Sequence, residues 1–286
     1  MTINVDPAKF TYFDVSPISP TIGAELSGIT LSGDLPDKAI EEVRNALLNY
    51  KVVFFRDQNE LTAEEHIAFA RRFGDLEIHP ATPKHQANPE ILRITHDENS
   101  KGSENAWHSD VTWRREPSLG SILRAHEVPS TGGDTLFSCM YSAYDALSPS
   151  MKDWVCTLKA RHDISRVFAG RLNKSVQELR ELYPVQEHPV VRTHPETGRR
   201  ALYVNTAFTD SIIGLSRRES EWLLDHLYSF AAIPEHQCRF RWQPGSIAFW
   251  DNRACQHYAA SDYFPQRRVM ERVTVAGDRP YFDPNH

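Results

Sequence analysis

Two short motifs, far apart in the 286-residue chain, carry side chains that can hold a metal ion. Trp107-His108-Ser109-Asp110 places an imidazole and a carboxylate two residues apart, and on an extended strand residues i and i+2 point to the same face. His257, much later in the chain, can supply a third ligand. Two imidazoles and one carboxylate form the facial triad that leaves coordination positions open on non-haem iron(II). We therefore predict that His108, Asp110 and His257 are metal ligands and form the catalytic centre.

The first of these motifs also has a non-catalytic interpretation. The His-x-Asp spacing alone is weakly specific, because about one such pair is expected by chance among 13 histidines. A surface or hydrogen-bonded histidine is the alternative for His108. The chain has no GxGxxG after a strand, no GxxxxGK[ST], no GxSxG and no HExxH. Dinucleotide-binding, P-loop, serine-hydrolase and zincin interpretations therefore have no motif to support them.

A basic segment near the C-terminal end can bind anions. In Arg268-Val-Met-Glu-Arg272, an extended backbone puts both arginines on one face. A guanidinium binds a carboxylate or a sulfonate through parallel charge-assisted hydrogen bonds. Thr135, which follows a Gly-Gly turn, could donate its hydroxyl to the same carboxylate. The alternative for the two arginines is a solvated strand edge on which Glu271 is their partner. The alternative for Thr135 is an ordinary strand threonine.

Composition limits the class of protein. The chain is 40% hydrophobic and 24% charged, as in ordinary globular proteins, and we expect one domain over residues 1–286. The net charge of −6 gives no support for a nucleic-acid partner. No apolar run approaches the roughly 20 residues of a membrane span. Four scattered cysteines without a CxxC pair fit a reducing cytoplasm. We expect a cytoplasmic protein without a membrane partner.

The predicted elements are short strands with a few helices. Capping boxes at Thr62–Glu65 and Ser216–Glu219 start two helices, and residues 37–49 have helical spacing. Strands rich in β-branched and aromatic residues are predicted at 52–55, 91–94, 120–125, 135–137, 189–191, 201–204, 239–242, 247–250 and 269–275. The helices do not alternate with the strands, which argues against a doubly wound parallel sheet. The pattern predicts an α+β, mainly β fold, with a double-sheet jelly-roll core and outer helices.

Several segments in a fixed order carry a family resemblance. They are Ile22–Gly28, Val52–Gln58, Phe73-Gly74, Ile78–Pro80, Trp107–Thr112, Pro129–Leu136, His188–Pro195, Ala201–Asn205, Phe249–Arg253, Gln256–Arg268 and Arg272–Asp278. In these segments the chain resembles the taurine and alkylsulfonate branch of the iron(II)/2-oxoglutarate dioxygenases. That branch also contains the 2,4-dichlorophenoxyacetate and alkyl-sulfate dioxygenases. The implied fold is a double-stranded β-helix (jelly roll) with outer helices.

The resemblance also implies cofactors and roles. His108, Asp110 and His257 would hold Fe(II). Arg268 and Thr135 would bind the distal carboxylate of the cosubstrate 2-oxoglutarate. Fe(II), 2-oxoglutarate and O₂ would together hydroxylate the substrate and give succinate and CO₂. The protein would supply positioning and electrostatics.

The substrate site is implied in the same way. Arg272 would pair with an anionic head group, His79 would line the site, and Phe168 and Phe208 would form its apolar wall. Thr82 stands where taurine enzymes of this family have a tyrosine.

Two further positions depart from the taurine pattern. Glu104, or Asn105 if the loop holds one extra residue, replaces an asparagine, and Val167 replaces a serine. With Thr82, these changes predict a roomier, less polar site and a substrate other than taurine itself. A Glu104 that points inward would repel an anion or bind an amine.

We therefore predict an Fe(II)- and 2-oxoglutarate-dependent dioxygenase. Its substrate would be a small anionic organic molecule (an alkylsulfonate, taurine-like compound or sulfate ester), which the reaction often cleaves. One alternative is the same chemistry on a carboxylate, such as an aryloxyalkanoate or an amino-acid derivative. The alternative of another class is a non-catalytic small-anion binding protein, which would need neither the triad nor the Arg268–Thr135 pair. The resemblance is consistent with a homodimer or a homotetramer.

Overall fold

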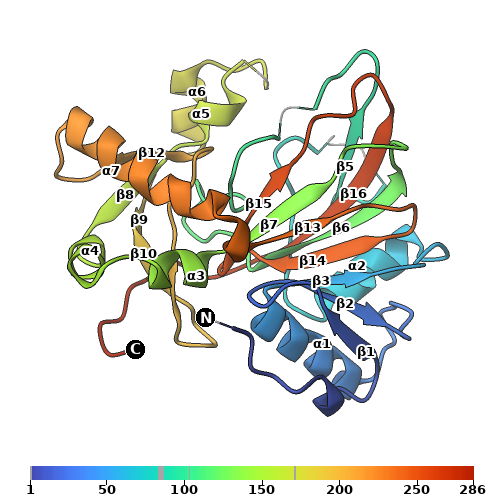
Figure 1. Ribbon diagram of the computed structural model, residues 1–286. Coiled ribbons are helices and arrows are strands. Elements are labelled where there is room, and N and C mark those ends of the chain that lie inside the picture. The colour runs from blue at the N-terminus through green and yellow to red at the C-terminus, as the bar shows by residue number, and fades with distance from the viewer. Residues whose placement is uncertain (1, 83–86, 103, 171) are drawn as a thin grey trace.

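A large, mainly antiparallel sheet organises the structure (Figure 1), a computed structural model that describes residues 2–82, 87–102, 104–170 and 172–286. Seven of its eight strands follow the order β1-β2-β3-β14-β6-β16-β4, and the eighth, β5, pairs with β16. Only the β2–β3 pairing is parallel among these strands. The strands are β1 (Asp14–Pro17), β2 (Ala24–Ser27), β3 (Val52–Phe55), β4 (Leu76–Glu77), β5 (Ile91–His96), β6 (Gly120–Glu127), β14 (Ile247–Asp251) and β16 (Arg268–Val275).

A smaller sheet faces the large one. It has the order β13-β7-β15, formed by Gln237–Phe240, Thr135–Cys139 and Cys255–Ala259. Aromatic rings join the two sheets: Phe54 of β3 stacks on Phe240 of β13 with ring centroids 4.0 Å apart. Phe137 of β7 lies 5.6 Å from Trp250 of β14. Such buried aromatic pairs fix how closely two sheets approach.

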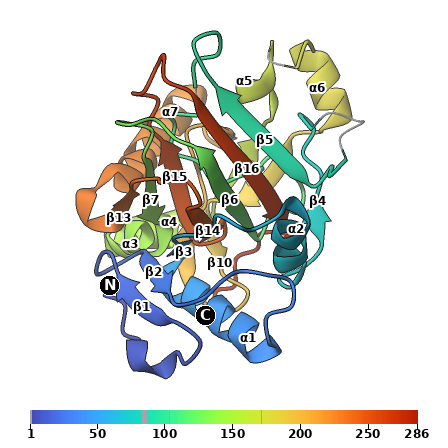
Figure 2. The ribbon, with the colours of Figure 1, turned by 90° about the vertical axis from the view of Figure 1, so that its right-hand side faces the viewer.

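The centre of the large sheet is buried on both faces, which explains why β3 reads Val-Val-Phe-Phe without polar residues. Alternate side chains of a strand point to opposite faces. Val52 and Phe54 belong to the core between the sheets, whereas Val53 and Phe55 belong to a second core. Helices α1 (Asp37–Tyr50) and α2 (Ala63–Arg71) cover this outer face, as Figures 1 and 2 show.

The remaining elements lie beyond the smaller sheet (Figure 1). Strands β12 (Thr209–Ile212), β8 (Lys159–His162) and β9 (Gln186–Pro189) form a third sheet, and β10 (Val191–Thr193) pairs with β11 (Arg200–Leu202). The helices here are α3 (Met140–Asp145), α4 (Pro149–Val155), α5 (Ser165–Phe168), α6 (Val176–Leu182) and α7 (Arg217–Ser229). None of the helices in the described parts of the chain is both long and apolar enough to cross a membrane.

The mainly β architecture with added helices agrees with the sequence prediction. Both predicted capping boxes are present, with reciprocal hydrogen bonds at Thr62–Glu65 and Ser216–Glu219. The prediction of one strand across residues 189–191 is wrong, because β9 ends at Pro189 and β10 begins at Val191. Proline has no N–H to donate to a continuing ladder, which accounts for a break there.

A buried histidine on α2 makes a testable contribution to acid stability. His66 is 0% exposed, and its Nε2 lies 3.2 Å from the carbonyl of Ile122 in β6. Burial lowers the pKa of His66 to about 4, whereas an unfolded chain takes up this proton near pH 6.5. Between these values the unfolded state binds more protons, so the free energy of unfolding falls as the pH falls.

We expect His66→Gln to weaken this pH dependence. Its slope between pH 6.5 and pH 4 should fall by about 1.4 kcal/mol per pH unit relative to the unmodified chain. Urea unfolding at a series of pH values measures the slope. His226→Gln, at an exposed position on α7, is the control and should leave the slope unchanged. Equal slopes for His66→Gln and the unmodified chain would contradict the assignment.

Candidate metal centre

The structure brings His108, Asp110 and His257 together. One potential ligand atom from each lies within 4.8 Å of the others, and the two imidazole centroids are 4.1 Å apart. Backbone pairing sets this spacing. The His108 N–H donates to the His257 carbonyl at 3.0 Å, and the His257 N–H donates to the His108 carbonyl at 2.8 Å. His257 itself lies on β15, so a strand of the smaller sheet positions one ligand and anchors another.

Asp110 does not lie on a strand, which corrects the sequence prediction. His108 forms an isolated bridge with His257, and the chain then enters a turn at Asp110. The next residue, Val111, has φ +48°, a left-handed conformation that is rare for a β-branched side chain. Such backbone strain costs about 1–3 kcal/mol and clusters at functional sites. The turn, rather than strand alternation, therefore aims the carboxylate at the imidazoles.

The Asp110 carboxylate is buried and has a partner on each oxygen. Ser121 of β6 donates its hydroxyl to Oδ2 at 2.7 Å, and Arg272 of β16 donates Nη1–H to Oδ1 at 2.7 Å. The Asp110 N–H donates to Asn252 Oδ1 at 3.1 Å. Burial alone would raise the pKa of Asp110, but Arg272, the two imidazoles and the Ser121 hydroxyl hold that pKa well below its usual range. The carboxylate is therefore ionised at neutral pH.

Each of the two imidazoles can also offer a nitrogen lone pair to a metal ion. His108 Nδ1 lies 2.8 Å from the Ala106 carbonyl, which fixes the proton there and leaves Nε2 free. Burial and the neighbouring His108 lower the pKa of His257 to about 3, so His257 is neutral. Two imidazoles and one ionised carboxylate are the donor set of a facial triad, and the residues therefore fit iron(II).

Arg268 lies on the same face of β16 as Arg272. It is 6% exposed, and its Nε has no hydrogen-bond partner among the described residues. The Arg268 guanidinium carbon lies 5.9 Å from the Trp242 ring centroid. The Trp242 indole donates to Thr135 Oγ at 2.9 Å, so the Thr135 hydroxyl keeps its own proton to donate. Arg268 and Thr135 thus contact the same indole, and the unsatisfied Nε fits a carboxylate ligand.

A cavity of about 520 Å³ opens beside the triad. His108, Asp110 and Arg272 are among its polar lining residues, which also include Arg93, Thr95, His96, Glu104, Arg166 and Thr206. The predicted substrate residues His79, Phe168 and Phe208 line it as well. The remaining apolar lining is Ala81, Leu92, Ile94, Ala106, Val111, Trp113, Val167 and Ala207. Thr135, Arg268 and His257 do not line this cavity, so the Arg268 side of the site lies deeper in the protein.

The positions that depart from the taurine pattern fall in different places. Thr82 is not among the cavity residues, and its buried hydroxyl has no hydrogen-bond partner within the described ranges. Glu104 lines the cavity, whereas Asn105 is exposed. The Glu104 carboxylate lies 3.2 Å from Nε2 of His96 on β5. Val167 lines the cavity, where it places an apolar side chain at the position at which the taurine pattern has a serine.

Sequence reasoning missed much of the cavity wall. Strand β5 contributes Leu92 to His96, because it pairs along β16 with His96 opposite Arg268 and Leu92 opposite Arg272 (Figure 2). A strand was predicted at 91–94, but nothing local indicated its neighbour. Ser121 and Asn252 were missed for the same reason.

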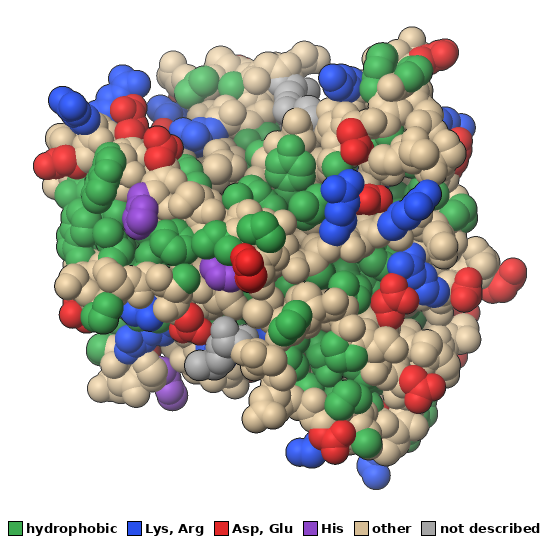
Figure 3. All heavy atoms as spheres, viewed as in Figure 1, with side chains coloured by type: hydrophobic (Ala, Val, Ile, Leu, Met, Phe, Trp, Pro, Cys, Tyr) green, Lys and Arg blue, Asp and Glu red, His purple; other side chains and the backbone are tan. Residues whose placement is uncertain are grey.

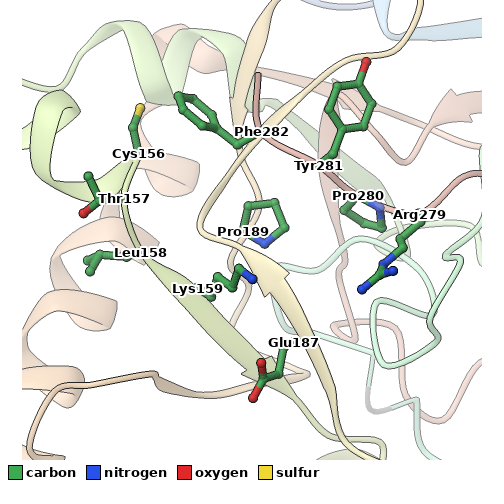
Figure 4. Close-up of a pocket in the computed structure, with 10 residues that line it drawn as sticks. All are labelled: Cys156, Thr157, Leu158, Lys159, Glu187, Pro189, Arg279, Pro280, Tyr281 and Phe282. Carbon is green, nitrogen blue, oxygen red and sulfur yellow. The ribbon is translucent and has the colours of Figure 1, made fainter. Parts of the chain in front are cut away.

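A second cavity of about 490 Å³ lies away from the triad, between β8, β9 and the C-terminal segment (Figure 4). Its lining mixes apolar side chains such as Phe282 with the charged Lys159, Glu187 and Arg279. It contains none of the predicted site residues, so the cavity beside the triad is the candidate substrate site.

The chain is similar to known dioxygenases over most of its length. The profile of the "Taurine catabolism dioxygenase TauD, TfdA family" matches residues 14–274. An alpha-ketoglutarate-dependent sulfate ester dioxygenase of Pseudomonas putida is 35% identical over 93% of this chain and 90% of its own. A (S)-phenoxypropionate/alpha-ketoglutarate-dioxygenase of Sphingobium herbicidovorans is 37% identical over 93% and 96%. The crystal structure of a taurine dioxygenase from Burkholderia xenovorans is 39% identical and superimposes with a TM-score of 0.83, covering 96% of this chain and 92% of that one.

We expect Asp110→Ala to abolish metal binding, because the triad loses its charged ligand while both imidazoles stay in place. Iron content after anaerobic loading and gel filtration measures the loss. Asp225→Ala, which removes an exposed carboxylate from α7, is the control and should retain stoichiometric iron. Stoichiometric iron in Asp110→Ala would show that the metal lies elsewhere.

Proposed function

The chain belongs to the taurine catabolism dioxygenase TauD, TfdA family, and from that premise we propose that it hydroxylates a small organic anion with an apolar chain. The proposed substrates are alkylsulfonates, taurine-like compounds and sulfate esters. The enzyme is an oxygenase that depends on Fe(II) and 2-oxoglutarate and uses O₂. The observation that carries the substrate proposal is Arg272, whose side chain is 11% exposed, at the metal side of a cavity that combines polar and apolar walls.

In this proposal His108, Asp110 and His257 hold the iron. Arg268 and Thr135 hold the distal carboxylate of 2-oxoglutarate. When bound, iron(II) would allow O₂, the oxidant, to react: 2-oxoglutarate would give up two electrons and be converted to succinate and CO₂, and the substrate would give up the other two as it is hydroxylated. The chain's own contribution is to place the substrate and to exclude water from the buried triad.

The substrate's head group would bind at Arg272. The Nε of this guanidinium is buried and has no hydrogen-bond partner within the described residues. Burial and the neighbouring Arg272 lower the pKa of His79 to about 3, so His79 adds a neutral hydrogen-bonding group and no second positive charge. The ring centroid of Phe168 lies 5.9 Å from that of His79, and the ring centroid of Phe208 lies 6.2 Å from that of His108. These rings would hold the apolar chain beside the metal.

A carboxylate head group is the second candidate. The 37% identity to the phenoxypropionate enzyme favours it, and a guanidinium binds a carboxylate as readily as a sulfonate. Glu104 at the cavity wall makes a second anionic group on the substrate unfavourable in either case. A non-catalytic anion-binding role would need no metal ligands, and the triad speaks against it.

The proposal extends to the whole protein. We propose one domain over residues 1–286 in which the two facing sheets form a double-stranded β-helix, or jelly roll. We also propose a cytoplasmic homodimer or homotetramer without nucleic-acid or membrane partners. Charge supports the absence of a nucleic-acid partner: the net charge is −6, and basic and acidic side chains are interspersed over the face shown in Figure 3.

The first test is succinate formation by the iron-loaded enzyme with 2-oxoglutarate and O₂. A panel of sulfonates, alkyl sulfates and aryloxy acids should show strong stimulation by one class, with sulfite, sulfate or phenol released in parallel. Stimulation by sulfonates or sulfates supports the leading substrate class, and stimulation by aryloxy acids supports the second. Slow succinate formation that no member of the panel stimulates would contradict the anionic substrate.

Arg272→Ala should raise the KM for the preferred substrate by roughly ten- to a hundredfold at saturating iron(II), the usual effect of losing a charge-assisted hydrogen bond. Slow 2-oxoglutarate consumption without substrate should persist, because Arg268 is intact. Arg93→Ala removes a positive charge from the same cavity wall and serves as the control. An unchanged KM in Arg272→Ala would place the anion elsewhere.

A further inference from the structure

Arg272 faces two sites at once. Its Nη1 donates to Asp110 Oδ1 at 2.7 Å, and its side chain is 11% exposed. Its Nε belongs to the other edge of the guanidinium and has no hydrogen-bond partner in the described parts of the chain. That second edge is the one that binds an anion through two parallel hydrogen bonds. One cation therefore contacts the Asp110 carboxylate and also lines the substrate cavity, where its side chain is 11% exposed.

Asp110 does not need Arg272 for its orientation. Ser121 holds Oδ2 at 2.7 Å, and Asn252 accepts from the Asp110 N–H at 3.1 Å. Asn252 Nδ2 in turn lies 3.3 Å from Ser121 Oγ. These partners hold the Asp110 backbone and one of its two carboxylate oxygens without Arg272. The Arg272 contact therefore adds mainly charge, and that charge has the same sign as a metal ion bound to the triad.

The other arginines near the cavity have carboxylate partners of their own. Arg93 pairs with Glu271 at 3.6 Å, and Arg166 pairs with Asp210 at 3.6 Å. Arg272 differs because its partner is a metal ligand. A divalent cation that binds there has to share Asp110 with the guanidinium and to approach a like charge, and both effects weaken its binding.

We propose that Arg272 couples the metal site to the anion site, so that an anion on its free edge offsets the guanidinium charge and tightens metal binding. By thermodynamic reciprocity, bound metal tightens the anion to the same degree. The inference rests on the proposed function, in which Arg272 receives the substrate's anionic head. It adds that the substrate stabilises the metal-loaded enzyme before any oxygen chemistry begins.

The test is a titration with Mn(II), without O₂ or 2-oxoglutarate, followed by electron paramagnetic resonance in the presence and absence of methanesulfonate. Saturating methanesulfonate should lower the Kd for Mn(II) about tenfold, within the usual range of coupling between sites. Arg272→Gln removes the charge and keeps a polar side chain. It should bind Mn(II) about tenfold more tightly than the unmodified enzyme without anion, and methanesulfonate should no longer change its affinity.

Two further variants separate charge from shape. Arg272→Lys keeps the positive charge, so its anion-free affinity for Mn(II) should stay near that of the unmodified enzyme. Arg93→Gln removes a charge from the same cavity wall without a contact to Asp110, and should change the affinity by less than about twofold. Circular dichroism and the Tm establish that each variant is folded. If Arg272→Gln does not fold, the lysine variant and the anion dependence of the unmodified enzyme still decide the question.

Each contrary result has a distinct meaning. Weaker Mn(II) binding in Arg272→Gln would make Arg272 a positioning residue for Asp110 and overturn the coupling. Unchanged binding in that variant, or no effect of methanesulfonate on the unmodified enzyme, would also overturn it. Unimpaired Mn(II) binding in His257→Gln would instead show that the metal does not occupy the triad. That last result contradicts the proposed function itself.

Discussion

The buried charge of Asp110 is the constraint on which the site depends. A carboxylate removed from water is costly unless hydrogen bonds and an opposite charge compensate it. Its partners come from three adjacent strands of the large sheet, which has the order β14-β6-β16. Asn252 directly follows β14, Ser121 lies on β6 and Arg272 lies on β16. Asp110 is thus placed over the middle of this sheet, and a change in strand order would leave the carboxylate without its partners.

The position of His257 depends on the packing between the two sheets. His257 packs against Trp250 of the large sheet, with ring centroids 4.8 Å apart, and against Phe137 of its own sheet at 6.1 Å. Protein interiors are close-packed, so these rings limit how far the imidazole can move. The loop after Asp110 has a similar support, because Thr112 accepts from Asn205 at 3.1 Å and lies 3.0 Å from Nδ1 of the buried His162. The core therefore provides the rigidity that a preorganised site requires.

Local sequence patterns predicted the parts of the structure that local forces determine. The capping boxes, α1 and most strands of the large sheet belong to this group, and so does the shared inward face of Arg268 and Arg272. The triad was predictable from residue types, although its geometry was not. The left-handed conformation of Val111 turns the chain at Asp110, and a valine gives no local signal for such a turn. Ser121 and Asn252 were not predictable because their role follows from strand order, which a single sequence does not reveal.

The two arginines of β16 show how one strand can serve two anions differently. They are four residues apart, which separates their backbones by about 13 Å on an extended strand. Arg268 has no close ion-pair partner among the described residues and lies against Trp242, so a carboxylate that reaches it would meet a cation that is not directly paired. Arg272 is already paired with Asp110, so an anion gains less there unless a metal ion draws on the same carboxylate. Under the proposed function, placing the two cations on one strand would thus separate a strong anion site from one whose strength depends on the metal.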